Sequence, residues 1–285
     1  KLLTLNFFLL NTHYSLLNTK PMIEIPEAVN LAEQLNRTIK GKKISSVVAA
    51  EHPHKFAWYF EDPSVYEKIL KGKTIDEAVT EGSFVEIRAG NAKILYTEGI
   101  NLRFIEDPKK LPKKHQLLIQ FEDETVLCAS IQMYGGLIVF KDDEYENEYY
   151  TVAKEKPSPL TDEFDKGYFF ELCKIAETKK NISLKALLAT EQRIPGLGNG
   201  CLQDVLYNAK LHPKTKFNEL TLDDKTILYN CIKKTLLEMA QKGGRDTEKD
   251  LFGEQCGYKT KLSKHTVDTQ CNNCGSMIRK AAYMG

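Results

Sequence analysis

Residues 183–199 read Ser-Leu-Lys-Ala-Leu-Leu-Ala-Thr-Glu-Gln-Arg-Ile-Pro-Gly-Leu-Gly-Asn. This stretch predicts a helix capped by Ser183, a tight turn through Gly196 and Gly198, and a second helix that starts at Asn199. The first amides of a helix have no partner inside the helix, and they attract anions. We therefore expect these amides and the Asn199 side chain to form a seat for a phosphate group. An ordinary helical hairpin with a solvated turn is the alternative.

The charge of the chain is unevenly distributed. Its 285 residues include 40 Lys or Arg and 39 Asp or Glu, a net charge of +1. Residues 171–285 nevertheless carry six more positive than negative charges, and residues 1–170 carry five more negative than positive charges. Lys180 and Lys185 precede the glycine turn and would extend the phosphate seat. A polyanionic partner fits this distribution, and a solvated charged face is the alternative.

The segments before and after the turn differ in their hydrophobic period. A helix is predicted from Pro26 to Gly41, and period-two alternation over residues 44–140 predicts antiparallel strands, including a hairpin around Gly90. An acidic and Pro-rich connector follows from Asp142 to Pro159, and helical periodicity then predominates. The chain is therefore predicted to have an α+β fold.

The N-terminal residues and the cysteines indicate in which cellular compartment the protein is expected. The apolar stretch near the start is too short to span a bilayer and has no small-residue cleavage site after it. Because the chain begins with Lys1 and Met22 offers an internal start, we expect residues 1–21 to be an extension outside the fold. Five of the seven cysteines are scattered, which is typical of a reducing compartment. We expect a cytoplasmic protein that associates with no membrane.

Several separated motifs resemble a known family, the formamidopyrimidine-DNA glycosylase/endonuclease VIII family, in a divergent branch. Its helix–two-turn–helix element has a lysine, a GxGN turn and a His-Pro pair, which Lys185, residues 196–199 and residues 212–213 match. The opening Glu24-Ile-Pro-Glu27 resembles the family's Glu-Leu-Pro-Glu, and a later glycine pair, Gly243-Gly244, precedes its zinc element. The resemblance covers about residues 22–285.

The resemblance implies a domain organisation. An N-terminal helix and an antiparallel β-sandwich would occupy residues 22–150, after the extension of residues 1–21. A helical domain with the two-turn element would occupy residues 151–255, and residues 256–285 would form a partial zinc ribbon. DNA would lie in the cleft between the first two domains.

The catalytic residues implied by the family are only partly present. Members attack the sugar of a flipped-out nucleotide with an N-terminal proline amine, helped by a glutamate and a hairpin lysine. Glu24 matches that glutamate, with Glu27 close by, but Ile23 stands at the nucleophile position and Ser83 at the lysine position. Ile23 could react only through a free α-amine, which argues against AP lyase activity. Glu24 would then activate water directly.

The DNA contacts implied by the resemblance are also altered. Tyr134 falls in the stretch that fills the gap left by the flipped base, and Gln132 would face the orphaned partner base in place of arginine. Lys113 falls where a DNA-contacting histidine is expected, and Glu98 where an apolar side chain is expected. For Tyr134 an ordinary core position is the alternative.

The family closes with a zinc ribbon made of two CxxC pairs. Only one pair, Cys271 and Cys274, is present before the chain stops at Gly285. We expect a truncated sequence, in which the complete protein binds one structural zinc ion and this fragment does not. Cys256 and His265 are the alternative source of two further ligands.

These observations together predict a monomeric, damage-directed DNA glycosylase that binds double-stranded DNA with damaged bases or abasic sites. The alternative is a catalytically silent lesion-binding protein of the same fold. A general nucleic-acid scaffold is a third class, and it would not prefer damaged over intact DNA.

Overall fold

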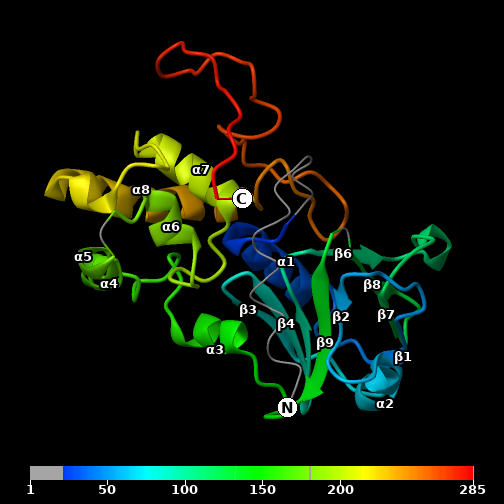
Figure 1. The fold of residues 1–285 in the computed structure, drawn as a ribbon. Coiled ribbons are helices and arrows are strands. Elements are labelled where there is room, and N and C mark those ends of the chain that lie inside the picture. The colour runs from blue at the N-terminus through cyan, green and yellow to red at the C-terminus, as the bar shows by residue number, and fades with distance from the viewer. Residues whose placement is uncertain (1–21, 132, 180, 285) are drawn as a thin grey trace.

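The computed structural model describes residues 22–131, 133–179 and 181–284. The predictions for residues 1–21, for Gln132 and for Lys180 therefore lie outside the described residues. Within the described part, a helical part and a β-sandwich meet around one central helix (Figure 1). No helix among these residues combines the length and the hydrophobicity needed to cross a bilayer.

The central helix is α1 (Ile25–Thr38), which begins in the predicted place. Pro26 suits its first turn because a helix does not need the amide of that position. Ala28, Leu31 and Leu35 recur at helical spacing and are buried along one side of the helix.

The β-sandwich consists of two sheets. One has the strand order β1-β7-β8-β6 and the other β2-β9-β5-β4-β3, and every pair is antiparallel except the short β2–β9 pair. The predicted hairpin around Gly90 is confirmed as β4–β5. The strands are β1 (Ile44–Ala49), β2 (Ala57–Trp58), β3 (Glu77–Glu81), β4 (Phe84–Ala89), β5 (Ala92–Tyr96), β6 (Ile100–Ile105), β7 (Leu117–Phe121), β8 (Val126–Ile131) and β9 (Gly135–Lys141). The short helices η2 (Pro63–Val65), α2 (Tyr66–Leu70) and η3 (Pro108–Lys110) lie between strands.

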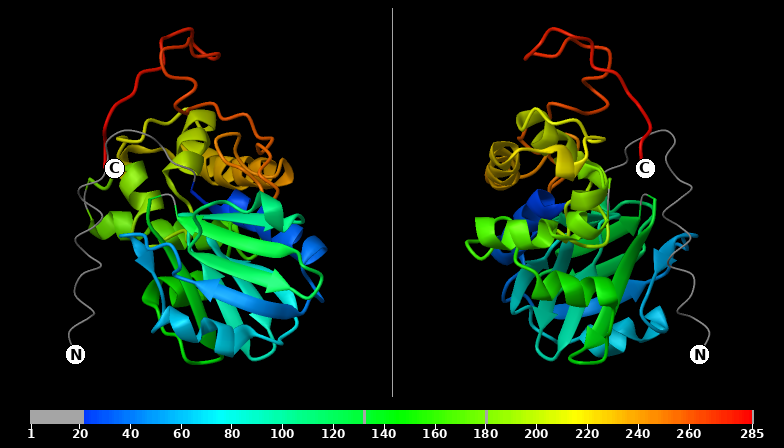
Figure 2. Two further views of the ribbon diagram at one scale, coloured as in Figure 1. Left: turned by 90° about the vertical axis from the view of Figure 1, so that its right-hand side faces the viewer. Right: turned by 60° about the vertical axis from the view of Figure 1, so that its left-hand side comes forward.

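The helical part stands on one end of the sandwich in both views of Figure 2. Ser183 caps α6 by accepting a hydrogen bond from the Ala186 amide, and Thr221 caps α8 together with Asp224, as the sequence predicts. The helices are α4 (Lys166–Cys173), α5 (Ile175–Thr178), α6 (Leu184–Ala189), α7 (Asn199–Asn208), η4 (Phe217–Glu219) and α8 (Leu222–Gln241).

Two hydrophobic cores correspond to these two parts. The first fills the space between the sheets and beneath α1, with Leu35, Val85 and Ile119 at its centre. The second lies among α4, α6, α7 and α8. Ile25, at the start of α1, belongs to the second core, whereas Ala28 belongs to the first. Helix α1 therefore packs in both cores.

The predicted connector between residues 142 and 159 contains a helix, α3 (Glu148–Glu155). Asn147 caps this helix, and Tyr150 and Ala153 pack with Phe84 on the outer face of a sheet. The helix was not predicted because acidic residues surround its two buried positions, Tyr150 and Ala153, which lie at helical spacing. The predicted domain boundary at residue 150 therefore falls inside the helix.

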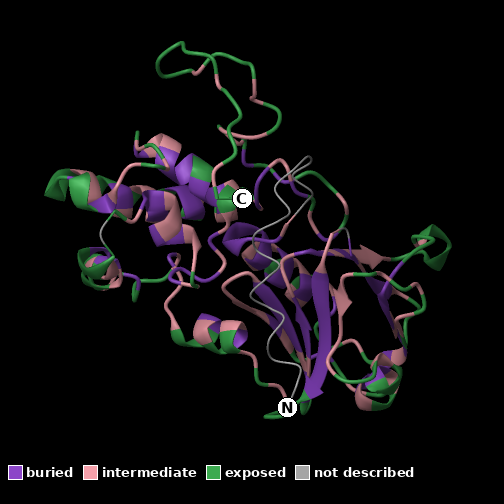
Figure 3. Ribbon diagram, in the orientation of Figure 1, coloured by how far each residue is buried: buried purple, intermediate pink, exposed green. Residues whose placement is uncertain are grey.

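The C-terminal segment, residues 259–284, consists of loops with one isolated bridge between Gln270 and Met277. Most of its residues are exposed or half-buried (Figure 3). These loops do not form the paired strands of a ribbon.

Candidate active site

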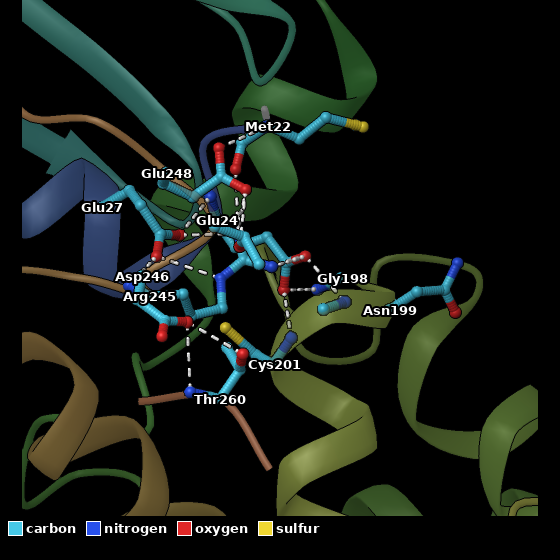
Figure 4. Close-up of polar contacts among 12 residues, drawn as sticks. Met22, Glu24, Glu27, Gly198, Asn199, Cys201, Arg245, Asp246, Glu248 and Thr260 are labelled. Carbon is cyan, nitrogen blue, oxygen red and sulfur yellow. Dashed lines mark hydrogen bonds and ion pairs between the residues drawn. The ribbon is translucent and has the colours of Figure 1, made fainter. Parts of the chain in front are cut away.

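A buried arginine joins the N-terminal segment to the end of α8. Arg245 donates to Glu24 Oε1 at 2.9 Å, to Glu27 Oε2 at 2.9 Å and to the Met22 carbonyl at 2.9 Å (Figure 4). Only 4% of Arg245 is exposed. Burial opposes its charge, but the carboxylates of Glu24 and Glu27 outweigh burial and hold the pKa of the guanidinium well above its ordinary value.

The Glu24 carboxylate lies at the N-terminus of α7. It accepts hydrogen bonds from the amides of Gly198 at 3.0 Å, Gly200 at 2.9 Å and Cys201 at 2.9 Å, in addition to that from Arg245. A carboxylate offers about four acceptor positions, and these four donors match that number. The helix terminus therefore holds a carboxylate from within the protein.

This arrangement corrects one prediction. The sequence suggested that the first amides of α7, including that of Gly198, are exposed donors for a phosphate. The amides of Gly198, Gly200 and Cys201 are instead bonded to Glu24, because a buried anion satisfies unpaired helix amides as well as a phosphate does. Asn199 is exposed, and its side chain points away from the carboxylate (Figure 4).

Two glycines allow the close approach of the charged groups. A Cβ on Gly198 would lie 2.5 Å from Glu24 Cδ, and a Cβ on Gly200 would lie 1.5 Å from Arg245 Nη1. No side chain fits at either position. The glycines that the sequence singled out for a turn are therefore also needed to admit the ion pair.

The backbone of Ile23, and not its side chain, forms part of the site. Its side chain is buried in the first core, and its nitrogen, which is bonded to Met22 in this chain, donates to the Glu98 carbonyl at 2.7 Å. An amide nitrogen has no basic lone pair and cannot form a Schiff base. Ser83, at the predicted lysine position, packs against the glycine turn, because a Cβ on Gly196 would lie 2.4 Å from the Ser83 nitrogen.

Glu98 and Tyr134 lie beside this segment. Burial, with a further contribution from Glu24, raises the pKa of the Glu98 carboxyl above its ordinary value. The Tyr134 hydroxyl is 3.9 Å from Met22 Sδ, and its ring centroid is 5.8 Å from that of Trp58. Burial raises the pKa of the Tyr134 hydroxyl to about 12. Tyr134 is half-buried, and its role as a wedge stays a prediction.

Glu248 is a third buried carboxyl group that the sequence analysis missed, together with Arg245. Its Oε2 accepts from the Met22 amide at 2.8 Å, and burial raises its pKa to about 7. One feature of the sequence could have pointed to Arg245. It directly follows a glycine pair, Gly243-Gly244, and both of these glycines have positive φ in the structure. Such a pair turns the chain sharply and brings the next side chain inward.

Comparisons with known proteins now add to this geometry. Residues 156–250 match the family profile described as the formamidopyrimidine-DNA glycosylase H2TH domain. The formamidopyrimidine-DNA glycosylase of Bacillus subtilis (strain 168) is 30% identical over 275 residues, which cover 93% of this chain and 95% of the relative. The chain belongs to the formamidopyrimidine-DNA glycosylase family.

Other members of the family agree with this assignment. The formamidopyrimidine-DNA glycosylase of Bacillus cereus (strain ZK / E33L) is 27% identical and is covered over 95% of its length. The Lactococcus lactis Fpg (MutM), solved in complex with DNA that contains N7-benzyl-Fapy-dG, superposes with a TM-score of 0.76 at 23% identity, covering 91% of this chain and 94% of that one. MutM from Thermus thermophilus gives a TM-score of 0.73 at 20% identity over the same shares of the two chains. The predicted fold, a β-sandwich with an N-terminal helix followed by a helical H2TH domain, is confirmed.

The predicted DNA-binding side chains of this family member lie in separate places. Lys113 is exposed in the loop between η3 and β7, and Asn199 is exposed at the start of α7. Lys185, on α6, is half-buried and donates to the Tyr283 carbonyl, and burial lowers its pKa. Contacts of these residues with DNA remain predictions.

The cysteine pair does not supply a complete structural zinc site. Cys271 and Cys274 flank a turn in which the Gly275 amide donates to the Cys271 carbonyl at 2.8 Å. Around these two thiols, the described residues bring no third or fourth ligand atom together. The alternative ligands do not complete the site: Cys256 is buried beside Gly244, His265 is exposed in a loop, and among the described residues neither forms a group of ligand atoms with the two thiols. Two thiols leave half of a tetrahedral set unfilled.

Proposed function

We propose that this chain is a DNA glycosylase that binds duplex DNA containing damaged bases or abasic sites and releases the damaged base. The observation that supports this function best is that the Glu24 carboxylate accepts hydrogen bonds from the glycine turn of the H2TH element. The chain that contains this arrangement aligns with a family member over 93% of its length. The relatives named above are formamidopyrimidine-DNA glycosylases, and the Lactococcus structure contains lesion DNA.

The proposed chemistry differs from amine catalysis. Because the nitrogen of Ile23 is an amide in this chain, a water molecule attacks C1′ of the sugar in place of an amine. The C1′–N bond breaks, its electron pair leaves with the base, and the base gains a proton. The water must lose a proton, and Glu24 is poorly suited to accept it, since four donors already engage its oxygens.

Glu98 is the better candidate for the proton acceptor. Its backbone is fixed next to Ile23, and burial raises the pKa of its carboxyl towards the range in which a general base is most effective. In this proposal Glu24 and Arg245 position the N-terminal segment. Asn199 and Lys185 face DNA phosphates, and Tyr134 fills the gap left by the flipped base.

The second candidate is a lesion-binding protein without catalysis. The engaged oxygens of Glu24 and the amide character of the Ile23 nitrogen favour it, because they remove the two groups on which the family's amine mechanism depends. Monomeric action and a cytoplasmic location remain predictions for both candidates.

Incubation with duplexes that contain an oxidised base or an abasic site, with and without borohydride, separates these functions. We expect base release without a trapped covalent adduct, and we expect Glu98→Gln to reduce release at least tenfold while binding persists. The matched control is Glu106→Gln, at an exposed position. A borohydride adduct at Ile23 would overturn the water mechanism, and tight binding without base release would establish the silent binder.

A further inference from the structure

Three ligating side chains converge on the β-sandwich, away from the cysteine pair. Glu51 and His52 lie in the loop after β1, and His115 lies just before β7. One ligand atom from each of the three residues lies within 4.8 Å of the others. Glu51 Oε2 is 3.3 Å from His115 Nε2, and the two imidazole centroids are 4.9 Å apart. The two loops are distant in sequence, so the fold itself creates the cluster.

The two ring nitrogens of His115 each face an oxygen. Nδ1 is 3.3 Å from the Pro112 carbonyl, and Nε2 is 3.3 Å from Glu51 Oε2. A neutral imidazole carries one N–H and can donate to only one of these oxygens, so the other nitrogen directs a lone pair at its oxygen. When Nδ1 donates to the Pro112 carbonyl, Nε2 is available to bind a cation. A backbone carbonyl that fixes one imidazole nitrogen and directs the other outward is the usual support of a metal-ligating histidine.

The imidazole of His52, a member of the same cluster, carries an unsatisfied nitrogen. Its Nδ1 is buried and has no hydrogen-bond partner among the described residues. A buried polar atom without a partner is costly and is rare in folded proteins. A cation bound between the three side chains would accept a nitrogen lone pair from each histidine, and the carboxylate of Glu51 would balance part of its charge.

We propose that Glu51, His52 and His115 bind one divalent transition-metal ion of the zinc class. Two imidazoles and one carboxylate are a ligand set that suits Zn²⁺, with a water molecule in the fourth position. Metal–ligand distances of about 2 Å require the three atoms to move slightly closer. The Glu51 side chain, which is 57% exposed, is free to rotate into place.

The ion would act as a clip between two loops. Gln116 follows His115 directly, and its Nε2 donates to the His52 carbonyl at 2.9 Å while its Oε1 accepts from the Ile131 amide at 2.8 Å. Ile131 is the last residue of β8 and precedes Tyr134 by three positions in the sequence. The metal would therefore stabilise the loop after β1 and, through Gln116, the end of β8, which lies close in sequence to the proposed wedge Tyr134. The metal site does not depend on the proposed glycosylase chemistry.

Zinc titration of the full chain tests this site. The Cys271→Ser/Cys274→Ser variant is the background, because free thiols would bind zinc on their own. After chelator treatment, we expect calorimetry to give one Zn²⁺ per chain and thermal denaturation to show a higher midpoint with zinc. His115→Ala should weaken binding at least tenfold, and His265→Ala, which removes an exposed histidine, should leave it unchanged.

Two further measurements keep the test independent of folding. Glu51→Gln alters an exposed side chain and should weaken zinc binding without lowering the metal-free midpoint. Bound Co²⁺ should give visible absorption without the thiolate charge-transfer band. Absence of zinc binding, or binding that survives both His115→Ala and Glu51→Gln, would overturn the proposal.

Discussion

At the scale of single residues, Arg245 is the group on which the buried charges of the site depend. It is the common partner of Glu24 and Glu27, and all three are less than a tenth exposed. Arg245→Met would leave two buried carboxylates without their cation, and removing one partner of a buried pair costs about 3–5 kcal/mol. We expect urea denaturation to show a loss of this size. Arg279→Met, which removes an exposed ion pair with Asp268, should change stability by less than about 1 kcal/mol. Equal losses for the two variants would contradict the network.

Glu248 makes the stability of the protein depend on pH. Burial raises its pKa from an ordinary 4.5 to about 7, so the folded state holds a proton that the unfolded state has released. The contribution of this group is complete below pH 4.5 and is lost as the pH rises through 7. Glu248→Gln keeps an acceptor for the Met22 amide but cannot ionise. We expect the stability of the native protein to fall relative to the variant by on the order of 1–3 kcal/mol between the two pH values. Chemical denaturation across this range, with the exposed Glu254→Gln as control, measures the difference.

The residues of the site were only partly predictable. Glu24 and Ile23 were found because they lie in a motif at the start of the fold. The partner of Glu24 lies 221 residues away, and no local pattern shows that the amides after Gly198 face inward. An anion site at a helix terminus looks the same in sequence whether its anion is a phosphate or a glutamate.

At the scale of elements, the start of α7 depends on a glycine for space. A helical Gly→Ala change normally stabilises a protein by up to about 1 kcal/mol. At Gly200 the added Cβ would collide with Arg245 Nη1, so we expect the opposite sign and a loss of about 3 kcal/mol. Gly167→Ala in α4 is the matched control, since its nearest atom, Asp165 Oδ1, would be 3.3 Å away. If urea denaturation shows that Gly200→Ala stabilises the protein, the close contact between this position and Arg245 is contradicted.

Elements with a strong hydrophobic period were predicted correctly, whereas several short helices were not, among them α2 and α3. The β4–β5 hairpin and α8 carry clear turn and capping residues, and both are confirmed. Helix α3 was missed because only Tyr150 and Ala153 of its eight residues are buried. Its formation depends on the sheet surface beneath it, and the sequence does not show that surface.

At the scale of the whole molecule, α1 determines how the two parts are coupled. The sequence predicts two domains, each with its own core. The structure has two large cores, but α1 contributes to both, and the buried Glu24–Arg245 ion pair joins the segment before α1 to the segment after α8. A helix shared in this way was not predictable, because its single apolar stripe does not reveal that one end packs elsewhere.

This coupling predicts that the described parts unfold together. Trp58, the one tryptophan in the sequence, lies in β2 and reports on the sandwich by fluorescence, whereas far-UV circular dichroism at the helix band reports mainly on the helical part. We expect the two signals to give the same urea midpoint. Leu236→Ala, in the buried face of α8, should cost about 2–5 kcal/mol and should lower both midpoints equally, although Trp58 belongs to the other part. If the fluorescence midpoint stays in place while the dichroism midpoint falls, the parts fold independently, and the contacts of α1 and Arg245 do not couple them.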